Sequence, residues 1–259
     1  MRNMFIKTVA AAAFAVAGAF TASAEPVKVG FSPEPYPPFF SPDASGNWTG
    51  WEVEIINAIC TEAKLECALT PIPWDGLIPA LTSKKIDAIM NSMSITEERK
   101  KSIDFSDKYY NTPTAVIGPK GEAFDATPAG LKGKIVGVQV STTHAAYVKK
   151  HFADAAEIKE YQTQDEANQD LAAGRIDATQ ADSIALDAFL KTDQGKACCD
   201  LKGMVAEDLE ILGPGVGAGL RKEDTELKGK INAAIKAIRD NGTYETITKK
   251  YFDFDIFGG

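Results

Sequence analysis

The sequence predicts an α/β protein of two lobes, each a mostly parallel sheet flanked by helices, with a ligand cleft between the lobes. Three observations lead to this fold class. Short apolar strand patterns alternate with longer helical patterns, which is typical of parallel sheets. One short motif occurs twice, and two proline- or glycine-containing segments are suited to crossing between lobes.

The first 24 residues predict a secretory signal peptide, 1–24. Arg2 and Lys7 give a positive start, an apolar run covers 8–20, and a small-residue cleavage site follows at 22–24. A core helix at the N-terminus is the alternative, but the run is too short to span a bilayer comfortably and has the flanks of a signal. We therefore expect export, and a soluble mature chain because no later apolar stretch is long enough to span a membrane.

The elements of the mature chain follow from apolar periodicity. Strands are expected at 27–31, 67–72, 86–90, 135–140, 158–161 and 176–180. Helices are expected at 52–63, 76–82, 143–152, 164–173, 183–191, 225–239 and 243–251.

The repeated motif indicates two similar lobes. Leu81 begins the sequence LTSKKIDA and Leu171 begins LAAGRIDA, so that each leucine is followed by an Ile-Asp-Ala strand start. Asp87 and Asp177 are therefore predicted to be corner residues between a helix and a strand, rather than ligand contacts.

Two segments are predicted to cross between the lobes, 109–114 with Asn-Thr-Pro and 212–217 with Gly-Pro-Gly-Val-Gly. The glycines of the second segment can absorb backbone rotation. The first lobe would then be discontinuous, built from 25–111 and 213–259, with 112–212 inserted as the second lobe.

The charge balance argues against nucleic acid as a partner. The chain has 28 Lys and Arg against 36 Asp and Glu, a formal net charge of −8, whereas phosphate binding requires basic patches. A cationic ligand fits this balance, although an acidic surface commonly serves solubility alone.

The four cysteines fall into two pairs. Cys60 and Cys67 would lie about 10 Å apart in a continuous helix, too far for a disulfide. A helix that ends near Ala63, followed by a strand from Leu65, would turn the chain back and permit the bond, which we expect. Cys198 and Cys199 are adjacent, and whether they form a bridge stays open.

Polar residues follow the strand at 86–90 and form the first candidate site. Asn91, Ser92, Ser94 and Thr96 lead into a short helix that carries Arg99. In open α/β sheets, ligands bind at the carboxyl ends of strands, and the guanidinium fork can hold a carboxylate with two hydrogen bonds. The alternative is that the hydroxyls only cap the helix and Arg99 is a surface residue.

The second candidate site follows two strands of the other lobe. Thr142, Thr143 and His144 open a helix whose free N–H groups suit a carboxylate. Asp182 follows the strand at 176–180 and could pair with an ammonium group. Simple capping of the two helices is the alternative for all of these residues.

Aromatic residues at strand ends could form the walls of the site. Tyr36 lies in a proline-stiffened loop with Glu34, and Trp74 follows the strand at 67–72. Two such rings can hold a planar or cationic group, although each alone also fits ordinary packing. Trp51 is assigned to the core.

Signals of catalysis are weak. The sequence contains no metal-spaced histidine cluster, no phosphate-binding glycine loop and no nucleophile elbow. Of the two histidines, His144 is a candidate for ligand contact and His151 for the surface. We expect no catalytic residues, no metal and no cofactor.

The chain resembles the polar amino-acid-binding family of periplasmic solute-binding proteins over 25–259, and within it the lysine/arginine/ornithine-, histidine- and opine-binding branch. The motifs that carry the resemblance are Tyr36-Pro37-Pro38-Phe39, Gly50-Trp51-Glu52-Val53-Glu54, Cys60 with Cys67, Ile86-Asp87-Ala88-Ile89, Ser94-Ile95-Thr96-Glu97-Glu98-Arg99, Gly137-Val138-Gln139, Gly219-Leu220-Arg221-Lys222, Asp240-Asn241-Gly242-Thr243-Tyr244 and the C-terminal Lys249-Lys250-Tyr251-Phe252-Asp253-Phe254-Asp255.

The resemblance implies a type II periplasmic-binding-protein fold and a monomer that delivers an amino acid, or an opine built on one, to an inner-membrane ABC permease and its ATPase. Arg99 and the backbone of Thr142 and Thr143 would hold the ligand carboxylate. Asp182 and Ser94, with the backbone of Ser92, would hold its ammonium. Tyr36 and Trp74 would enclose its side chain, and closure of the lobes would bury it.

Four positions depart from the branch. Pro33 stands where an acidic residue is frequent, with Glu34 one place later, and Asn91 stands for serine, Trp74 for phenylalanine and His144 for glutamine. A cationic amino acid or an opine is the ligand we expect. Cyclohexadienyl dehydratases, which act on prephenate or arogenate, have a similar fold and are the alternative. A sensor module is a third reading, disfavoured by the lack of a signalling domain.

Overall fold

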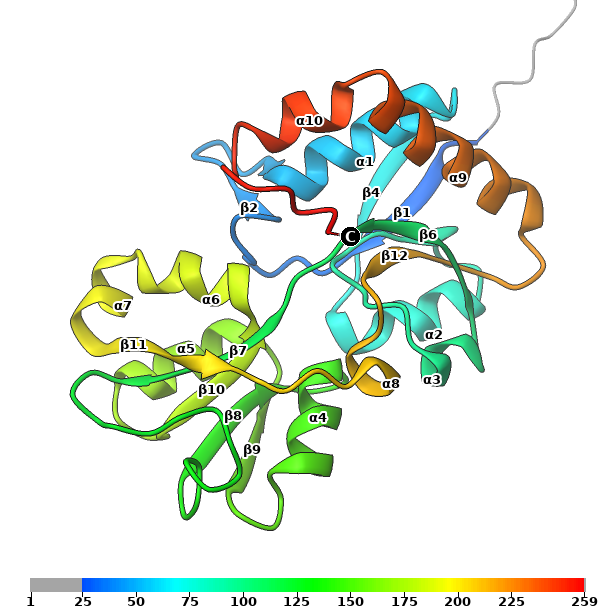
Figure 1. Ribbon diagram of the computed structural model, residues 1–259. Helices are drawn as coiled ribbons and strands as arrows, with labels where there is room; N and C mark the ends of the chain where they lie inside the picture. Colours follow the sequence, from blue (N-terminus) through cyan, green and yellow to red (C-terminus); the bar gives the residue numbers. More distant parts are fainter. Residues whose placement is uncertain (1–24, 259) are drawn as a thin grey trace, which may run out of the picture.

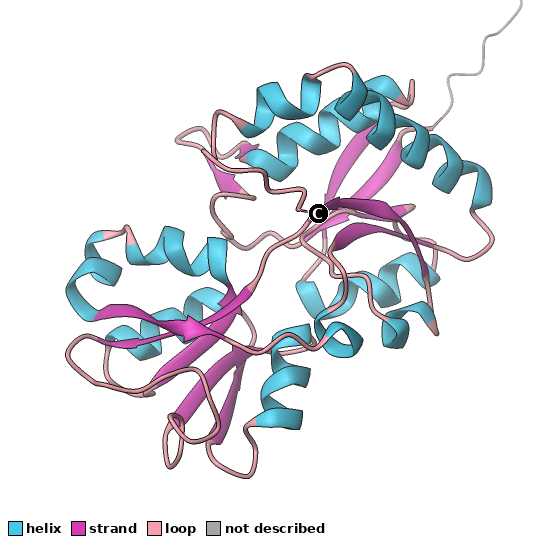
Figure 2. Ribbon diagram, in the orientation of Figure 1, coloured by secondary structure: helices cyan, strands magenta, loops and turns pink. Residues whose placement is uncertain are grey.

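Two five-stranded sheets, each covered by helices on both faces, form the two lobes of the computed structural model (Figures 1 and 2), which describes residues 25–258. The predicted signal peptide at 1–24 and residue 259 lie outside the described residues. Within the described part of the chain, no helix is long and apolar enough to cross a membrane.

The strands of the two sheets follow one spatial order. The first sheet runs β4 (Cys67–Pro71), β1 (Val27–Phe31), β5 (Ala88–Ile89), β12 (Val216–Leu220), β6 (Asp104–Tyr110). The second runs β9 (Glu157–Tyr161), β8 (Ile135–Gln139), β10 (Ala178–Asp182), β7 (Thr114–Pro119), β11 (Cys199–Met204). A small ribbon of β2 (Ser41–Pro42) and β3 (Trp48–Thr49) adjoins the first sheet.

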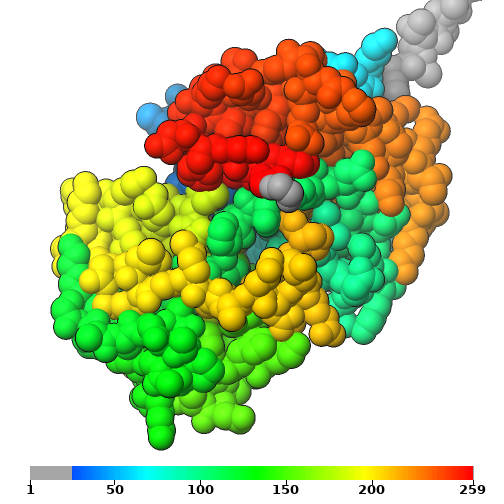
Figure 3. Space-filling model, viewed as in Figure 1, coloured from blue at the N-terminus to red at the C-terminus, as the bar shows by residue number. Residues whose placement is uncertain are grey.

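One strand in each sheet runs against the others, and it is the strand that arrives from the other lobe. In the first sheet β12 is antiparallel to both of its neighbours, and in the second sheet β7 is. The chain leaves the first sheet after β6 and enters the second as β7, then returns from β11 to β12. The two crossing segments lie at the junction of the lobes on the face shown in Figure 3. The fold class predicted from the sequence is confirmed.

Apolar clusters on each face of each sheet form the core. In the first lobe, α1 (Trp51–Glu62), α9 (Thr225–Asp240) and α10 (Thr243–Thr248) cover one face. The 3₁₀ turn η1 (Trp74–Gly76), α2 (Leu77–Thr82) and the cluster beside α3 (Glu97–Lys100) cover the other. Trp51 is fully buried in this core, as predicted.

The second lobe is covered in the same way. The helices α4 (Thr143–His151) and α8 (Leu209–Leu212) lie on one face of its sheet. The helices α5 (Gln164–Ala172), α6 (Ser183–Leu190) and α7 (Asp193–Cys198) lie on the other. The carboxyl ends of β8 and β10 and the start of α4 lie at the edge that faces the first lobe.

Asp87 and Asp177 occupy equivalent corners in the two lobes. Asp87 accepts a hydrogen bond from the backbone N–H of Lys28 at 3.0 Å, and its own N–H donates to the carbonyl of Lys28 at 2.8 Å. Asp177 makes the same two contacts with Ile135, at 2.7 and 2.9 Å. Asp87 thus ties the start of β5 to β1, and Asp177 ties the start of β10 to β8, so the predicted corner role is confirmed.

Some elements differ from those expected. The strands β6, β11 and β12 are absent from the prediction because their sequences are rich in polar residues or glycine, and packing between sheet neighbours stabilises them instead. The strand β7 is absent from the prediction as well, although its sequence is mostly apolar. The strand predicted at 176–180 runs over Ala178–Asp182, because the corner at Asp177 delays its start and places Asp182 inside it.

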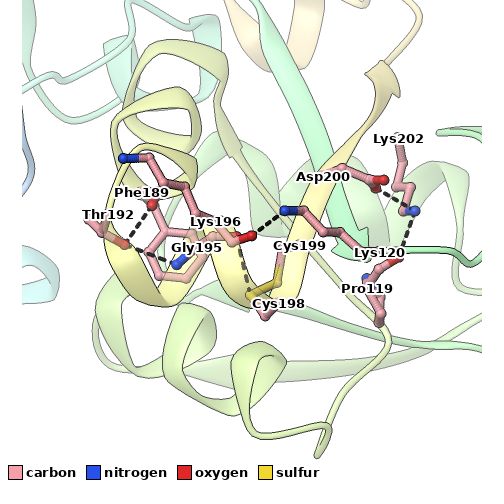
Figure 4. The surroundings of a disulfide bond; sticks show 10 residues. All are labelled: Pro119, Lys120, Phe189, Thr192, Gly195, Lys196, Cys198, Cys199, Asp200 and Lys202. Carbon is pink, nitrogen blue, oxygen red and sulfur yellow. Dashed lines mark hydrogen bonds and ion pairs between the residues drawn. A yellow bond between two sulfur atoms is a disulfide. The ribbon is translucent and has the colours of Figure 1, made fainter.

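Both cysteine pairs are bridged. Cys60 lies near the end of α1 and Cys67 at the start of β4, with Cα atoms 6.2 Å apart, so the predicted bond is confirmed. Cys198 and Cys199 form a second bridge between adjacent residues where α7 meets β11 (Figure 4). Beside it, the backbone N–H of Lys120 donates to the carbonyl of Cys198 at 2.8 Å.

Candidate functional site

One cavity at the junction of the lobes brings the predicted site residues together. The space between its lining atoms, open solvent included, is about 620 Å³. Its lining includes Glu34, Tyr36, Trp74, Asn91, Ser92, Ser94, Arg99, Thr142, Thr143, His144 and Asp182. The first seven come from the first lobe and the other four from the second. Their part in ligand binding stays a prediction.

Arg99 faces the cavity rather than the solvent. Thr96 caps α3 by accepting from the backbone N–H of Arg99 at 3.2 Å, so this hydroxyl has the capping role that the sequence left open. The guanidinium donates to the carbonyl of Ser94 at 2.9 Å and, across the cleft, to that of Ser141 at 3.3 Å. It also lies over the ring of Trp74, 5.6 Å from the centroid.

Burial makes this guanidinium a strong partner for an anion. Loss of hydration lowers the pKa of Arg99 to about 10, and the nearby charge of Asp182 offsets part of that effect. The group is protonated at neutral pH and only partly compensated, so a carboxylate in the cavity would interact with it strongly.

Asp182 stands at the N-cap position of α6 yet makes no capping hydrogen bond. Its Oδ2 accepts from the hydroxyl of Tyr36 in the other lobe at 2.7 Å, and its Oδ1 lies 3.5 Å from Nε2 of His144. Burial and the charge of Asp182 raise the pKa of Tyr36 well above its ordinary value, so the phenol remains a donor. The carboxylate is thus directed to the cleft.

The N-terminus of α4 forms the wall opposite Arg99. Thr142 caps this helix, because its Oγ1 accepts from the backbone N–H of Ala145 at 3.0 Å. Thr143 and His144 follow in the first turn, both buried, and Nδ1 of His144 lies 3.4 Å from the hydroxyl of Thr114. Capping and a place on the cavity wall are therefore compatible at Thr142.

Glu34 reaches across the cleft to the second lobe. The amide of Gln139 donates to Glu34 at 3.1 Å and to the carbonyl of Gln162 at 3.0 Å. Burial raises the pKa of Glu34, and the hydrogen bond from Gln139 counters that shift in part. The position of Glu34, one residue after Pro33, therefore still places an acid on the cavity wall.

The floor of the cavity rests on interactions within the first lobe. Oδ1 of Asn91 accepts from the backbone N–H of Ser32 at 2.6 Å, which joins the end of β5 to the end of β1. The indole Nε1 of Trp74 is buried and has no hydrogen-bond partner among the described residues. A ligand acceptor could satisfy that donor.

Sequence reasoning missed several residues of the lining. These are Ser32, Pro35, Gln139, Thr163 and Gln164. Gln139 ends β8, and Thr163 caps α5 directly after β9, so both follow the strand-end rule that located the other residues. Among residues 25–258, no group of three or more His, Cys, Asp or Glu side chains could hold a metal ion.

Comparison with known proteins gives consistent matches over nearly the whole chain. The model of the bacterial extracellular solute-binding proteins, family 3, matches residues 27–254. The L-arginine-binding protein of Pseudomonas aeruginosa is 46% identical over 239 residues, which cover 92% of both chains. The histidine-binding periplasmic protein of Salmonella typhimurium is 42% identical over 245 residues, which cover 93% of both chains.

A solved structure is similar as well. An ancestral arginine-binding protein bound to arginine superposes with a TM-score of 0.80 at 36% identity, over 87% of this chain and 97% of that one. The curated relatives named above are binding proteins and not enzymes.

Proposed function

The chain belongs to the bacterial extracellular solute-binding proteins of family 3, and from this membership we propose that it captures a cationic amino acid, L-arginine before others. It would act in the periplasm as a monomer and deliver the ligand to an inner-membrane ABC permease with its ATPase. The predicted family is confirmed, as is the prediction of a binding protein rather than an enzyme.

The observation that carries the proposal is a pair of opposite charges facing one cavity from the two lobes. Arg99 of the first lobe would hold the ligand carboxylate, together with the free N–H groups at the start of α4. Asp182 of the second lobe would hold the ammonium, together with Ser94 and the backbone of Ser92. A free amino acid carries both charges on one carbon and so bridges the lobes.

An acid on the cavity wall supports a cationic side chain. Glu34 accepts a hydrogen bond there from a neutral amide, Gln139, and its raised pKa reflects burial without full compensation. A guanidinium would supply that compensation. Tyr36 and Trp74 offer ring faces to the aliphatic or planar part of such a ligand. The named relatives that bind arginine and histidine agree with this preference.

Titration calorimetry on mature protein, unfolded and refolded to remove carried ligand, tests the proposal. The panel holds arginine, lysine, ornithine, histidine, glutamine, octopine, nopaline, prephenate and arogenate. We expect the tightest binding for arginine. Tighter binding of an opine would change the ligand class, whereas turnover of prephenate or arogenate without amino-acid binding would favour the dehydratase.

One variant distinguishes recognition of the ligand ammonium from recognition of the rest of the ligand. Asp182→Asn removes the negative charge of the side chain and retains its shape, and we expect arginine to bind at least tenfold more weakly. Arginine analogues without the α-ammonium should bind wild type and variant alike. Equal weakening of both would contradict the assignment of Asp182 to the ammonium.

A further inference from the structure

A buried carboxyl group lies directly behind the cavity without being part of its lining. Glu52 belongs to the first turn of α1 and is fully buried. Its carboxylate accepts from the backbone N–H of Ser92 at 2.8 and 3.0 Å, from the hydroxyl of Ser92 at 2.8 Å, and from the hydroxyl of Tyr109.

These contacts set the conformation of a residue that lines the cavity. Ser92 has a φ of 52°, in the left-handed region that costs a non-glycine residue about 1 kcal/mol. Both of its donors, the N–H and the hydroxyl, point to Glu52. Neither donor is left to oppose an ammonium group in the cavity, which requires acceptors.

The same carboxyl is sensitive to charge in the cavity. Burial raises the pKa of Glu52 to about 7, against the hydrogen bonds from Tyr109 and Ser92, and the charge of Asp182 raises it further. Tyr36 and Tyr110 lie close enough to feel the charges of Glu52 and Asp182, and both stay neutral because burial and these charges raise their pKa. The ionisation of Glu52 is therefore coupled to whatever neutralises Asp182.

We propose that Glu52 is a positioning residue of the ammonium subsite, and that binding of the ligand ammonium drives a proton off Glu52 into the solvent. The inference rests on the proposed function. When the ammonium pairs with Asp182, it cancels the charge that disfavours ionised Glu52. The ionised carboxylate then holds both donors of Ser92 more strongly, so the proton loss and the ordered Ser92 support each other.

The test is the number of protons released when L-arginine binds near pH 7. It is measured by calorimetry in two buffers of different ionisation enthalpy. We expect a fractional proton release from wild type, and a dissociation constant that falls about three- to tenfold from pH 6 to pH 8.

Two variants in α1 test whether Glu52 is the group that releases the proton. Glu52→Gln retains an acceptor for the Ser92 N–H and a donor for the hydroxyls, and should release fewer protons and change affinity less than about twofold over the same range. Glu54→Gln removes an equal charge from the same helix, where Glu54 contacts Lys250 and Tyr251 at the surface. It should behave like wild type.

The outcomes separate the two hypotheses. A purely structural role for Glu52 would weaken binding in Glu52→Gln without altering the proton count, and would overturn the inference. An unchanged proton count would assign the release to another group. Arginine binding to wild type without proton release would overturn the inference alone, even if Glu52→Gln does not fold. Failure of wild type to bind any amino acid would overturn the proposed function as well.

Discussion

Tyr36 and Asp182 lie in different lobes and share a hydrogen bond of 2.7 Å between the phenol oxygen and Oδ2. The acceptor is the carboxylate to which we assign the ligand ammonium. The cleft is therefore closed across the same group that would recognise the ligand, and this arrangement would couple closure to binding.

Removal of this hydroxyl should weaken closure without removing the aromatic wall. We expect Tyr36→Phe to lower the affinity for arginine about fivefold, the effect of one lost hydrogen bond between lobes. Titration calorimetry measures this change in affinity. Tyr161→Phe is the control, because its hydroxyl donates to Asp170 within the second lobe. Equal losses in both variants would show that the effect is not one of closure.

The fork of Arg99 should matter more than its charge. Arg99→Lys retains the cation but cannot hold a carboxylate with two hydrogen bonds, so affinity should fall on the order of 100-fold while the melting temperature changes little. Arg221→Lys is the matched control. Arg221 donates to the carbonyl of Ile86 at 2.6 Å and to Asp87 at 3.0 Å inside the first lobe. The Arg221→Lys substitution should lower the stability of the protein and leave its affinity for arginine unchanged.

Glu34 should determine the preference for a charged side chain. Citrulline has nearly the shape of arginine without its charge, and we expect Glu34→Gln to reduce the ratio of their affinities about tenfold. In wild type the preference should fall as the pH drops toward the raised pKa of Glu34, because the carboxyl then loses its charge. An unchanged ratio in the variant would show that the side chain is recognised elsewhere.

Buried Glu52 should also give the ligand-free protein a distinctive pH dependence. Its pKa of about 7 in the folded state exceeds its ordinary value of 4.5. Between these values the unfolded chain has lost the proton that the folded protein retains, so stability falls as pH rises, by about 3 kcal/mol at most from this group. Urea unfolding at pH 5 and pH 8 should show a smaller fall for Glu52→Gln than for Glu54→Gln or wild type.

The two disulfides should give different peptide products in a tryptic digest without reductant. Trypsin cleaves after Lys64, so the bridge of Cys60 and Cys67 should join two peptides. Cys198 and Cys199 share the peptide 197–202, which should be lighter than its reduced form by two hydrogen atoms. Mass spectrometry detects both the joined peptides and the lighter peptide. Alkylation of either cysteine pair in unreduced protein would show that its disulfide is absent.

Much of the site could be predicted because strand ends are local features of the sequence. Asn91, Thr142 and Asp182 each follow a predicted strand closely, and parallel strands bring such positions to one edge. Glu52 could not be found this way. Its contact with Ser92 spans 40 residues and depends on how α1 packs beside β5. Nothing in its helical pattern distinguishes it from Glu54.

The crossing strand β12 was unpredictable for a different reason. The sequence Val-Gly-Ala-Gly-Leu of β12 has a low strand propensity, and its five residues are nonetheless fully buried between β5 and β6. Glycine is favoured there because neighbouring side chains leave no space for a Cβ atom. A Cβ at Gly217 would lie 2.9 Å from the side chain of Ile95.

Because the chain crosses between lobes twice, β1 near its start and α10 near its end both belong to the first lobe (Figure 1). Fluorescent labels on β1 and α10 would therefore both move with the first lobe and keep their separation as the cleft opens and closes. A biosensor built on this protein needs one label in the second lobe, for example at the exposed Lys132 between β7 and β8.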